Sequence, residues 1–235
     1  MKTPLEVINL SKVYNNIDAV KDISFKVNKN EIIGILGPNG CGKTTTIGMI
    51  LGLLKPTNGK ALINGIDIET NRVNLLDNLN FISPYIELPK KLTVKQNLEV
   101  YGRLYDVKNL KKKIEYLSEK LRLGEIINKI TGELSSGQKN RVSLAKSIIN
   151  DPMVLLLDEP TASLDPETGD FVRSFLENYQ KEKKTSILLA SHNMAEVERL
   201  CSSVIMMNKG EIIEQGKPNE LIKKHNQENM EEVFL

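Results

Sequence analysis

The stretch GPNGCGKT, residues 37 to 44, constrains the fold of this chain more than any other part of the sequence. It fits the pattern G-x-x-x-x-G-K-[ST] and lies between the strand-like EIIGIL and the helix-like TTTIGMILGLL. In such a loop, glycines let successive backbone N–H groups turn inward, and the helix N-terminus adds a partial positive charge. The motif requires a strand before it and a helix after it, so the sequence predicts an α/β fold that binds a nucleoside triphosphate.

The side chains of this loop suggest separate roles. Lys43 supplies a mobile positive charge for the β- and γ-phosphates, and the Thr44 hydroxyl would hold Mg2+. Cys41 lies beside the helix N-terminus and Lys43, both of which favour a thiolate, so we expect maleimide to modify it unless nucleotide is bound. The alternative is a small residue that the turn tolerates. Nucleotide contacts are expected from Gly37, Pro38, Asn39, Gly40, Cys41, Gly42, Lys43, Thr44 and Thr45.

A second motif, MVLLLDEPTASLDP at residues 153–166, narrows the chemistry. Its apolar run has the length of a buried strand, and an acid at the carboxyl end of such a strand lies where α/β proteins bind ligands. Asp158 can therefore reach a Mg2+ ion held by Thr44. Two adjacent carboxylates in so apolar a run are costly unless one faces the metal and the other a reacting water. We expect Glu159 to be the general base or to orient that water.

The rest of the chain divides by its periodicity. Alternating residues between 4 and 30, and a hairpin at 57–67 with Asn-Gly turns, indicate a small antiparallel sheet. Helical periodicity dominates 92–149, and the apolar runs 153–158 and 186–191 are typical of parallel strands covered by helices on both faces. We predict one domain, 1–235, with four parts: an antiparallel β part at 1–30 and 57–70, a mostly parallel P-loop core at 32–56 and 150–224, a helical insertion at 92–149, and a tail at 225–235 that either docks or frays.

Composition excludes several classes of protein. With 235 residues, 40% hydrophobic and 26% charged, the chain can bury a sizeable core. Lysine plus arginine total 32 against 30 acidic residues, so a net charge of +2 gives no strong field for nucleic acid, and none is expected as a partner. Two cysteines are too few for a disulfide framework. The start lacks the apolar core of a signal peptide, and Gly-Pro-Asn-Gly with Lys43 interrupts the apolar run 32–54, so no membrane span is expected.

The polar stretch ELSSGQKNR, residues 133–141, opens the helix-like run NRVSLAKSII. Taken alone, it predicts an ordinary helix N-cap at Ser135 or Ser136. However, LSSGQ followed by this run and then by LLLDEP resembles the ATP-binding cassette (ABC) family, whose signature is L-S-G-G-Q. The resemblance covers nearly the whole chain: the phosphate loop 37–44, the signature 134–138, the acidic strand 153–159, SLD at 163–165 and SHN at 191–193.

The resemblance implies the ABC ATPase fold and a set of site residues. The signature would close over the ATP of a second ATP-binding subunit, with backbone N–H groups and the Ser135 hydroxyl near the γ-phosphate. His192 matches the switch histidine that senses this phosphate, and Asp165 matches the loop between the two ATP sites. Tyr14 matches the aromatic that stacks on adenine, although a packing residue in an alternating strand remains an equal alternative. The signature contacts are expected from Ser135, Gly137 and Gln138.

Two positions depart from the family pattern. Ser136 stands where the signature has its first glycine, and its small side chain should leave function intact. Pro84, in FISPYIELP, stands where the family has a glutamine that touches the Mg2+ shell and signals to the membrane subunit. Proline offers neither a carboxamide nor an N–H group. Ser83 and Tyr85 are both candidates to replace the glutamine, whereas Gln96 lies in a helical pattern farther along.

The resemblance therefore implies a dimeric ATP-hydrolysing subunit, peripheral on the cytoplasmic face of a membrane, with ATP and Mg2+ as ligands. ATP binding would close the dimer and hydrolysis would reopen it. The helical insertion and the loop 81–92 would dock on a separate membrane subunit, and the ending EQGKPNEL…MEEVFL resembles exporters of the ABC-2 type. Alternatives are a soluble cassette ATPase, for example in iron–sulfur assembly, and a cassette that binds ATP without hydrolysis. A GTPase is disfavoured because NKGE, 208–211, is better interpreted as a hairpin turn.

Overall fold

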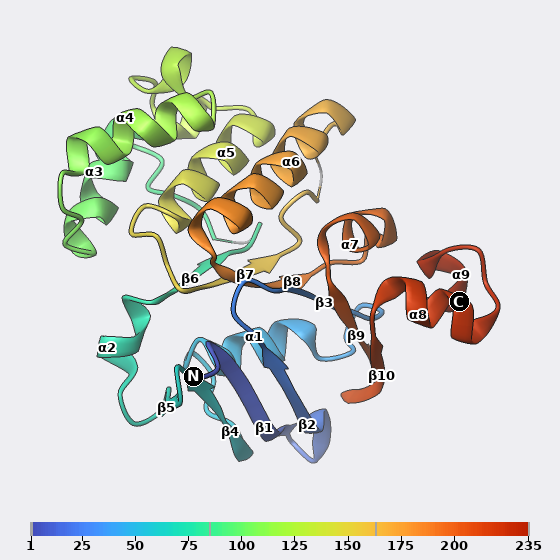
Figure 1. Cartoon of the computed structure of the whole chain (residues 1–235). Helices are drawn as coiled ribbons and strands as arrows, with labels where there is room; N and C mark the ends of the chain where they lie inside the picture. The colour runs from blue at the N-terminus through green and yellow to red at the C-terminus, as the bar shows by residue number, and fades with distance from the viewer. Residues whose placement is uncertain (1, 85, 163, 235) are drawn as a thin grey trace.

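Two β-sheets organise the chain, and the computed structural model describes them within residues 2–84, 86–162 and 164–234 (Figure 1). The larger sheet has the strand order β10-β9-β3-β8-β7-β6, and all of its strands are parallel except β10. This is the α/β fold that the phosphate loop predicted. The strands are β3 (Ile32–Leu36), β6 (Leu79–Ile82), β7 (Val154–Asp158), β8 (Ser186–Ala190), β9 (Ser203–Asn208) and β10 (Glu211–Gly216).

The smaller sheet is antiparallel, with the order β2-β1-β4-β5. Asn64 and Gly65 make the turn between β4 and β5 at positive φ, as expected of an Asn-Gly hairpin. The other predicted turn, at Asn58 and Gly59, is wrong because β4 already begins there. Gly59 lies opposite a bulge in β1, and a Cβ on it would come within 2.1 Å of the Asn9 carbonyl oxygen. The strands are β1 (Leu5–Tyr14), β2 (Ile17–Val27), β4 (Asn58–Ile63) and β5 (Ile66–Asp67).

The described residues contain nine α-helices, of which α1 to α7 lie between strands and α8 and α9 follow the last strand. The helix after the phosphate loop, α1, ends at Ile50 rather than continuing through Leu54 as its apolar sequence suggested. Gly52 turns the chain at a φ of 64°, and the N–H groups of Leu53 and Leu54 bond back to the Gly48 carbonyl. The helices are α1 (Lys43–Ile50), α2 (Arg72–Leu76), α3 (Val94–Leu104), α4 (Leu110–Lys120), α5 (Ser136–Ser147), α6 (Pro166–Lys183), α7 (Met194–Leu200), α8 (Pro218–His225) and α9 (Met230–Phe234).

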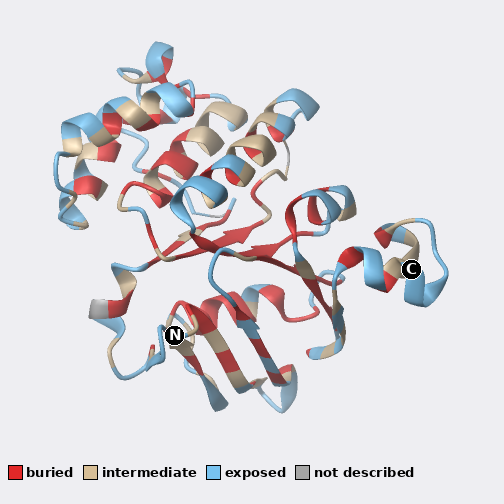
Figure 2. Cartoon of the chain, in the orientation of Figure 1, coloured by how far each residue is buried: buried red, intermediate tan, exposed pale blue. Residues whose placement is uncertain are grey.

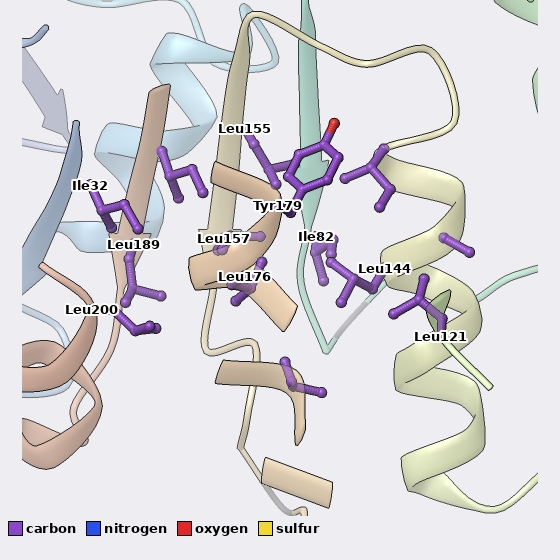
Figure 3. Close-up of a cluster of buried hydrophobic side chains, with 14 of the residues drawn as sticks. Ile32, Ile82, Leu121, Leu144, Leu155, Leu157, Leu176, Tyr179, Leu189 and Leu200 are labelled. Atoms are coloured by element: carbon purple, nitrogen blue, oxygen red, sulfur yellow. The ribbon is translucent and has the colours of Figure 1, made fainter. Parts of the chain in front are cut away.

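The residues of β7 are buried (Figure 2). Its apolar side chains alternate between two clusters, because successive side chains of a strand point to opposite faces. Leu155 and Leu157 pack with side chains of α5 and α6, such as Leu176 (Figure 3). Val154 and Leu156 pack on the other face with α1 and the antiparallel sheet. The prediction of helices on both faces is therefore only half right, since the antiparallel sheet shares one face with α1.

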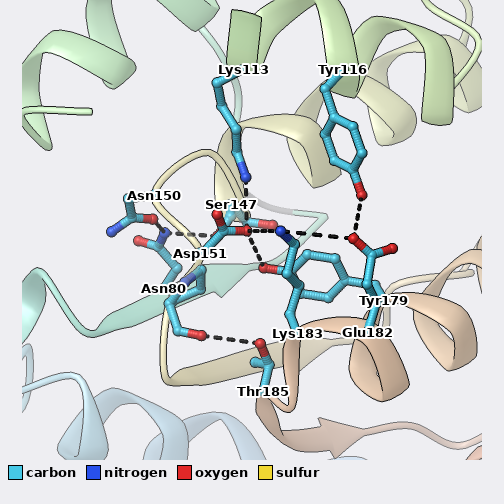
Figure 4. A network of polar contacts seen from close by, with 11 residues as sticks. Asn80, Lys113, Tyr116, Ser147, Asn150, Asp151, Tyr179, Glu182, Lys183 and Thr185 are labelled. Atoms are coloured by element: carbon cyan, nitrogen blue, oxygen red, sulfur yellow. Dashed lines mark hydrogen bonds and ion pairs between the residues drawn. The ribbon is translucent and has the colours of Figure 1, made fainter. Parts of the chain in front are cut away.

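A polar network joins the helical region to the core (Figure 4). Asp151, in the turn before β7, accepts from Lys113 of α4 at 2.7 Å and lies 3.7 Å from Lys183 of α6. The Tyr116 hydroxyl of α4 donates to Glu182 of α6 at 3.1 Å. These contacts tie α4 to the carboxyl end of α6.

The C-terminal part of the described chain packs against the core. The stretch NKGE lies at the turn between β9 and β10, with Lys209 and Gly210 at positive φ, which confirms the hairpin interpretation. Met230 of α9 is fully buried, so this part of the tail docks rather than frays.

Among the described helices, none combines the length and the apolar character needed to cross a membrane.

Candidate active site

The phosphate loop curls between β3 and α1, and lack of space for a side chain requires glycine at two of its positions, Gly37 and Gly42. Gly42 has a φ of 108°, and a Cβ on it would come within 2.6 Å of the Ala19 carbonyl oxygen. A Cβ on Gly37 would lie 2.3 Å from the Cys41 sulfur and 2.5 Å from the Met207 carbonyl oxygen. The loop is therefore fixed from outside by the backbone of β2 and β9.

A pocket of about 170 Å³ lies over this loop, between the N-terminus of α1 and the carboxyl end of β7. The Lys43 ammonium group beside it donates to the Gly37 carbonyl at 2.6 Å and to the Pro38 carbonyl at 3.3 Å. Both partners are neutral, so an anion in the pocket would be a stronger partner for Lys43. The lining residues are Ala19, Asn39, Gly40, Gly42, Lys43, Thr44, Thr45, Asp158 and Glu159.

Cys41 departs from its predicted role. Its side chain is 2% exposed and packs in the apolar cluster beneath the loop, and within the described chain it does not line the pocket. The expectation of a readily modified thiol is therefore contradicted, because the fold buries this side chain among residues of α1 and the two sheets. Gly37 and Pro38 also lie outside the described lining, and the Pro38 carbonyl accepts from the Cys41 N–H at 3.2 Å.

Asp158 ends β7 on the pocket side and is only 3% exposed. Burial, with the neighbouring Glu159 charge as the second cause, raises the pKa of Asp158 above its usual value. The Ser83 hydroxyl at the end of β6 donates to Asp158 Oδ2 at 3.4 Å. Ser83, rather than Pro84, is thus the residue of this loop that reaches the acidic strand, and Tyr85 lies outside the described residues.

The oxygen ligands of the pocket suit Mg2+. Asp158 offers a carboxylate and Thr44 an exposed hydroxyl, and Mg2+ uses one or two carboxylates while phosphates and water complete its shell. The described residues contain no cluster of three or more His, Cys, Asp or Glu side chains that could hold a metal alone. A Mg2+ ion held by Asp158 and Thr44 would take its remaining ligands from phosphate groups and water.

Glu159 and His192 meet at the edge of the pocket. Glu159 has a φ of 52°, an unusual conformation for this residue type, and its N–H bonds the Ala190 carbonyl of β8 at 2.8 Å. His192 follows β8 and its Nδ1 lies 2.7 Å from Glu159 Oε2. The imidazole is otherwise open, with 66% of its side chain exposed. The carboxyl ends of two adjacent strands thus bring a carboxylate and an imidazole into contact.

The signature stretch forms a helix cap apart from this pocket. Ser135 Oγ accepts from the Gln138 N–H at 3.3 Å, and Gln138 Oε1 accepts from the Ser135 N–H at 3.1 Å, which confirms the N-cap interpretation for Ser135. A Cβ on Gly137 would lie 3.2 Å from Thr168, so the start of α5 packs near the start of α6. None of these signature residues belongs to the described lining of the Lys43 pocket.

Tyr14 and Asp165 are also predicted site residues that lie outside the described lining of the Lys43 pocket. Tyr14, at the end of β1, is 42% exposed, with the Lys12 ammonium group 4.9 Å from its ring centre. Asp165 caps α6 by accepting from the Thr168 N–H at 2.9 Å. Ser163, the first residue of the SLD stretch, is outside the described residues.

Sequence reasoning missed several neighbours of this site. Ala19 lines the pocket, and Asn140 of α5 donates to the Pro160 carbonyl at 2.7 Å, directly after Glu159. Glu196 of α7 is buried behind Glu159 and His192. Only the three-residue spacing from Asn193 to Glu196, typical of a helix start, gave a signal for it.

A separate groove of about 310 Å³ runs between the 82–90 loop and α5. Pro84, Ile86 and Lys139 line it, and Glu159 lies among its lining residues too. Ile86 is 51% exposed, although it is large and apolar. The groove therefore connects an apolar surface to the edge of the active site.

Comparisons with known proteins agree with this geometry. A family model described as ABC transporter matches residues 20–162. The ABC transporter ATP-binding protein NatA of Bacillus subtilis is 36% identical over 222 residues, which cover 93% of this chain and 90% of that protein. The Nod factor export ATP-binding protein I of Rhizobium johnstonii is 38% identical over 221 residues, 93% of this chain and 70% of that protein.

Solved structures agree as well. One described as an ATP binding subunit of an ABC transporter has a TM-score of 0.91 at 27% identity and covers 99% of this chain and 98% of that one. A dimeric ATP-binding cassette bound to ADP and Pi has a TM-score of 0.83 and covers 91% of this chain and 98% of that one. At 24% identity, the second similarity supports the fold alone.

Proposed function

The chain belongs to the ABC transporter family of ATP-binding proteins, and from this premise we propose that it drives an exporter through the residues around the Lys43 pocket. ATP binding and hydrolysis coupled to transport are the activity of this family, and both the resemblance and the fold class expected from the sequence are confirmed. Export is the finer proposal. It is supported by the similarity to a Nod factor export protein. The relatives give no support to the soluble iron–sulfur alternative.

The contact between His192 and Glu159 is the observation that carries the catalytic proposal. A carboxylate held by an imidazole at the edge of a phosphate-sized pocket is placed to accept a proton from water or to orient it. His192, which is the more exposed of the two, would meet the γ-phosphate. Lys43 would exchange its carbonyl partners for the β- and γ-phosphates.

Thr44 and Asp158 are the residues that would hold Mg2+, and Ser83 would support the carboxylate in place of the family's glutamine. The ion supplies positive charge against the phosphates when it is bound. We also propose that Tyr14 stacks on adenine, because its ring is accessible at a strand end. Asp165, as the cap of α6 near the start of α5, would couple the two helix N-termini.

The signature supports a homodimer as the working state. The capped start of α5 does not belong to the described lining of the Lys43 pocket of its own chain, and a helix N-terminus is a ready anion site. Ser135, Gly137 and Gln138 would therefore close over the γ-phosphate of a second copy. The groove beside Pro84 and the exposed Ile86 would receive the membrane subunit. Such docking would place the protein on the cytoplasmic face of the membrane, as a peripheral subunit.

The variant Glu159→Gln tests this proposal. It should still bind ATP but lose about a hundredfold or more in turnover, as removal of a general base does. Since hydrolysis no longer reopens the dimer, the variant with Mg-ATP should elute as a dimer in size-exclusion chromatography, and with ADP as a monomer. Turnover at the wild-type rate would remove Glu159 from the catalytic role.

A second variant tests the interface in the Glu159→Gln background. Ser135→Arg places a bulky cation at the start of α5 and should abolish the dimer. Because Ser135 also caps α5, the matched control is Ser135→Ala, which loses the cap, about 1 kcal/mol, without adding bulk. Dimer formation by the arginine variant would contradict the proposed closure over a partner's nucleotide.

A further inference from the structure

A carboxylate is buried behind the pair of Glu159 and His192. Glu196, in the first turn of α7, is 1% exposed and forms no ion pair within 4 Å among the residues that the structure describes. Burial raises its pKa, and the hydroxyls that bond it oppose this shift. A buried carboxylate is costly unless its hydrogen bonds are made, so the partners of Glu196 matter.

Two hydroxyl groups supply those bonds, and they come from different loops. Thr161 Oγ1 donates to Glu196 Oε1 at 2.8 Å, and Ser191 Oγ donates to Oε2 at 2.7 Å. Thr161 lies two residues after Glu159, and Ser191 lies immediately before His192. One side chain therefore joins the loop that carries the proposed base to the loop that carries the proposed switch.

The two hydrogen bonds of Glu196 lie just beyond the point where the backbone pairing of β7 with β8 ends. The last register pair between β7 and β8 is Asp158 with Ala190, and the Glu159 N–H makes one more bond to the Ala190 carbonyl at 2.8 Å. Beyond it, Glu196 bridges the two chains through their hydroxyls. Thr161 and Ser191 are thus held at a fixed separation. Only Glu159 and Pro160 lie between β7 and Thr161, whereas Ser191 directly follows β8 and His192 directly follows Ser191.

Both bonds run from a hydroxyl donor to a carboxylate oxygen of Glu196, which uses the hydroxyl proton of each partner. The Ser191 oxygen is then free to accept from the Asn193 N–H at 3.1 Å, and the Asn193 side chain in turn accepts from the Glu196 N–H at 3.1 Å. A glutamine would present an amide N–H to one hydroxyl and disturb this arrangement.

We propose that Glu196 is a positioning residue for ATP hydrolysis, which holds the two loops at the separation that lets His192 Nδ1 contact Glu159 Oε2. The inference rests on the roles proposed above for Glu159 and His192. Glu196 does not belong to the described lining of the Lys43 pocket, so it acts on turnover and leaves nucleotide binding unchanged.

Three single variants remove parts of the link: Glu196→Gln, Thr161→Val and Ser191→Ala. Each should lower kcat by about tenfold to a hundredfold, the scale of a misplacement near 1 Å, with KM for ATP changed by less than about twofold. The double variant Glu196→Gln with Thr161→Val should lose little beyond the worse single variant, because both interrupt one bond. The matched control is Glu198→Gln, an exposed acid on the same helix, which should keep the wild-type kcat.

A spectroscopic measurement separates positioning from general stability. The chain has only two histidines, so protein with 15N-labelled histidine gives two sets of ring signals. At a pH where imidazole is neutral, the contact with Glu159 favours the Nδ1–H tautomer of His192. Glu196→Gln and Thr161→Val should shift the His192 signals toward the Nε2–H form. His225, whose ring lies 2.6 Å from Glu214, serves as the internal reference.

The proposal is overturned if the variants keep the wild-type kcat, or if kcat falls while the His192 ring signals stay at their wild-type positions. Should Glu196→Gln fail to fold, Thr161→Val and Ser191→Ala decide alone, since each deletes one hydroxyl. The ring signals report the contact and not the chemistry. They therefore test this inference even if Glu159→Gln were to hydrolyse ATP normally and refute the catalytic proposal.

Discussion

Replacing Asp158 with asparagine should make the nucleotide-free protein more stable while it removes Mg-dependent hydrolysis. Asp158 is almost completely buried, beside the charge of Glu159. Lys43 attracts it, but this ammonium group is already bonded to two loop carbonyls. Asp158 has no ion pair within 4 Å in the described part of the chain, and its hydrogen bond from Ser83 is long, at 3.4 Å. The free site therefore holds a poorly compensated charge.

The expected gain in the free energy of unfolding follows from this environment of Asp158. Removing a buried, repelled charge while keeping the shape of the side chain should add about 1–2 kcal/mol to the free energy of unfolding. For a chain of this length each kcal/mol corresponds to roughly 2–4 °C, so Tm should rise by about 2–8 °C. Asparagine keeps an acceptor for the Ser83 hydroxyl, so little hydrogen bonding is lost.

Calorimetry at several pH values checks the size and the sign of the Tm difference between Asp158→Asn and the wild type. Because the pKa of Asp158 is raised in the folded state, its ionisation destabilises the protein above that pKa, and the effect vanishes below the unfolded value of about 3.9. The Tm difference should be largest near neutral pH and shrink on acidification. With Mg-ATP the wild type should have the higher Tm. Ligand at a hundred times Kd stabilises the wild type by about 2.7 kcal/mol and the variant by less.

The matched control is Asp165→Asn, at an exposed helix cap where aspartate and asparagine are nearly equivalent. Its nucleotide-free Tm at neutral pH should remain close to that of the wild type. The reasoning would be refuted if Asp158→Asn were no more stable than the wild type without nucleotide, or if Asp165→Asn gained as much.

Three other outcomes are expected. Maleimide should modify Cys41 and Cys201, which are 2% and 7% exposed, far more slowly in the native protein than in denaturant, with or without ATP. Fast labelling of Cys41 in the native protein, measured by mass spectrometry, would show that the loop opens. Gly37→Ala, whose methyl group would meet the Met207 carbonyl at 2.5 Å, should lose ATP binding in equilibrium titration, and binding at the wild-type level would show that the loop can relax. Pro84→Gln should leave ATP affinity nearly unchanged but alter Mg2+ dependence or transporter-stimulated turnover; a large loss of binding would mean that this loop has another role.

The parts of the site that could be predicted are those in which local sequence and chemistry coincide. The phosphate loop needs a strand, glycines and a helix in immediate succession, and the acid at the end of β7 follows from a buried strand that ends at the sheet edge. The cap at Ser135 is equally local, because both of its hydrogen bonds lie within four residues.

The parts that could not be predicted depend on contacts distant in the sequence. Cys41 faces the core because β9 and α1 close over it, and no local pattern distinguishes that direction from the pocket. The choice of Ser83 as the neighbour of Asp158 follows from the pairing of β6 with β7. The burial of Glu196 depends likewise on hydroxyl groups from two other loops, which no pattern in its own helix indicates.

The order of the larger sheet has a consequence for amide hydrogen exchange. In the described chain β6 and β10 are its two terminal strands, and β6 pairs with β7 alone, whereas β7, β3 and β8 have strands on both sides. A strand bonded along one edge opens at lower free energy than its central neighbours, so the β6 amides should exchange before those of β7, β3 and β8. Ser83 directly follows that strand, and the groove beside Pro84 begins there. A subunit bound in the groove would slow this exchange, which would make the β6 amides a reporter of docking that needs no turnover.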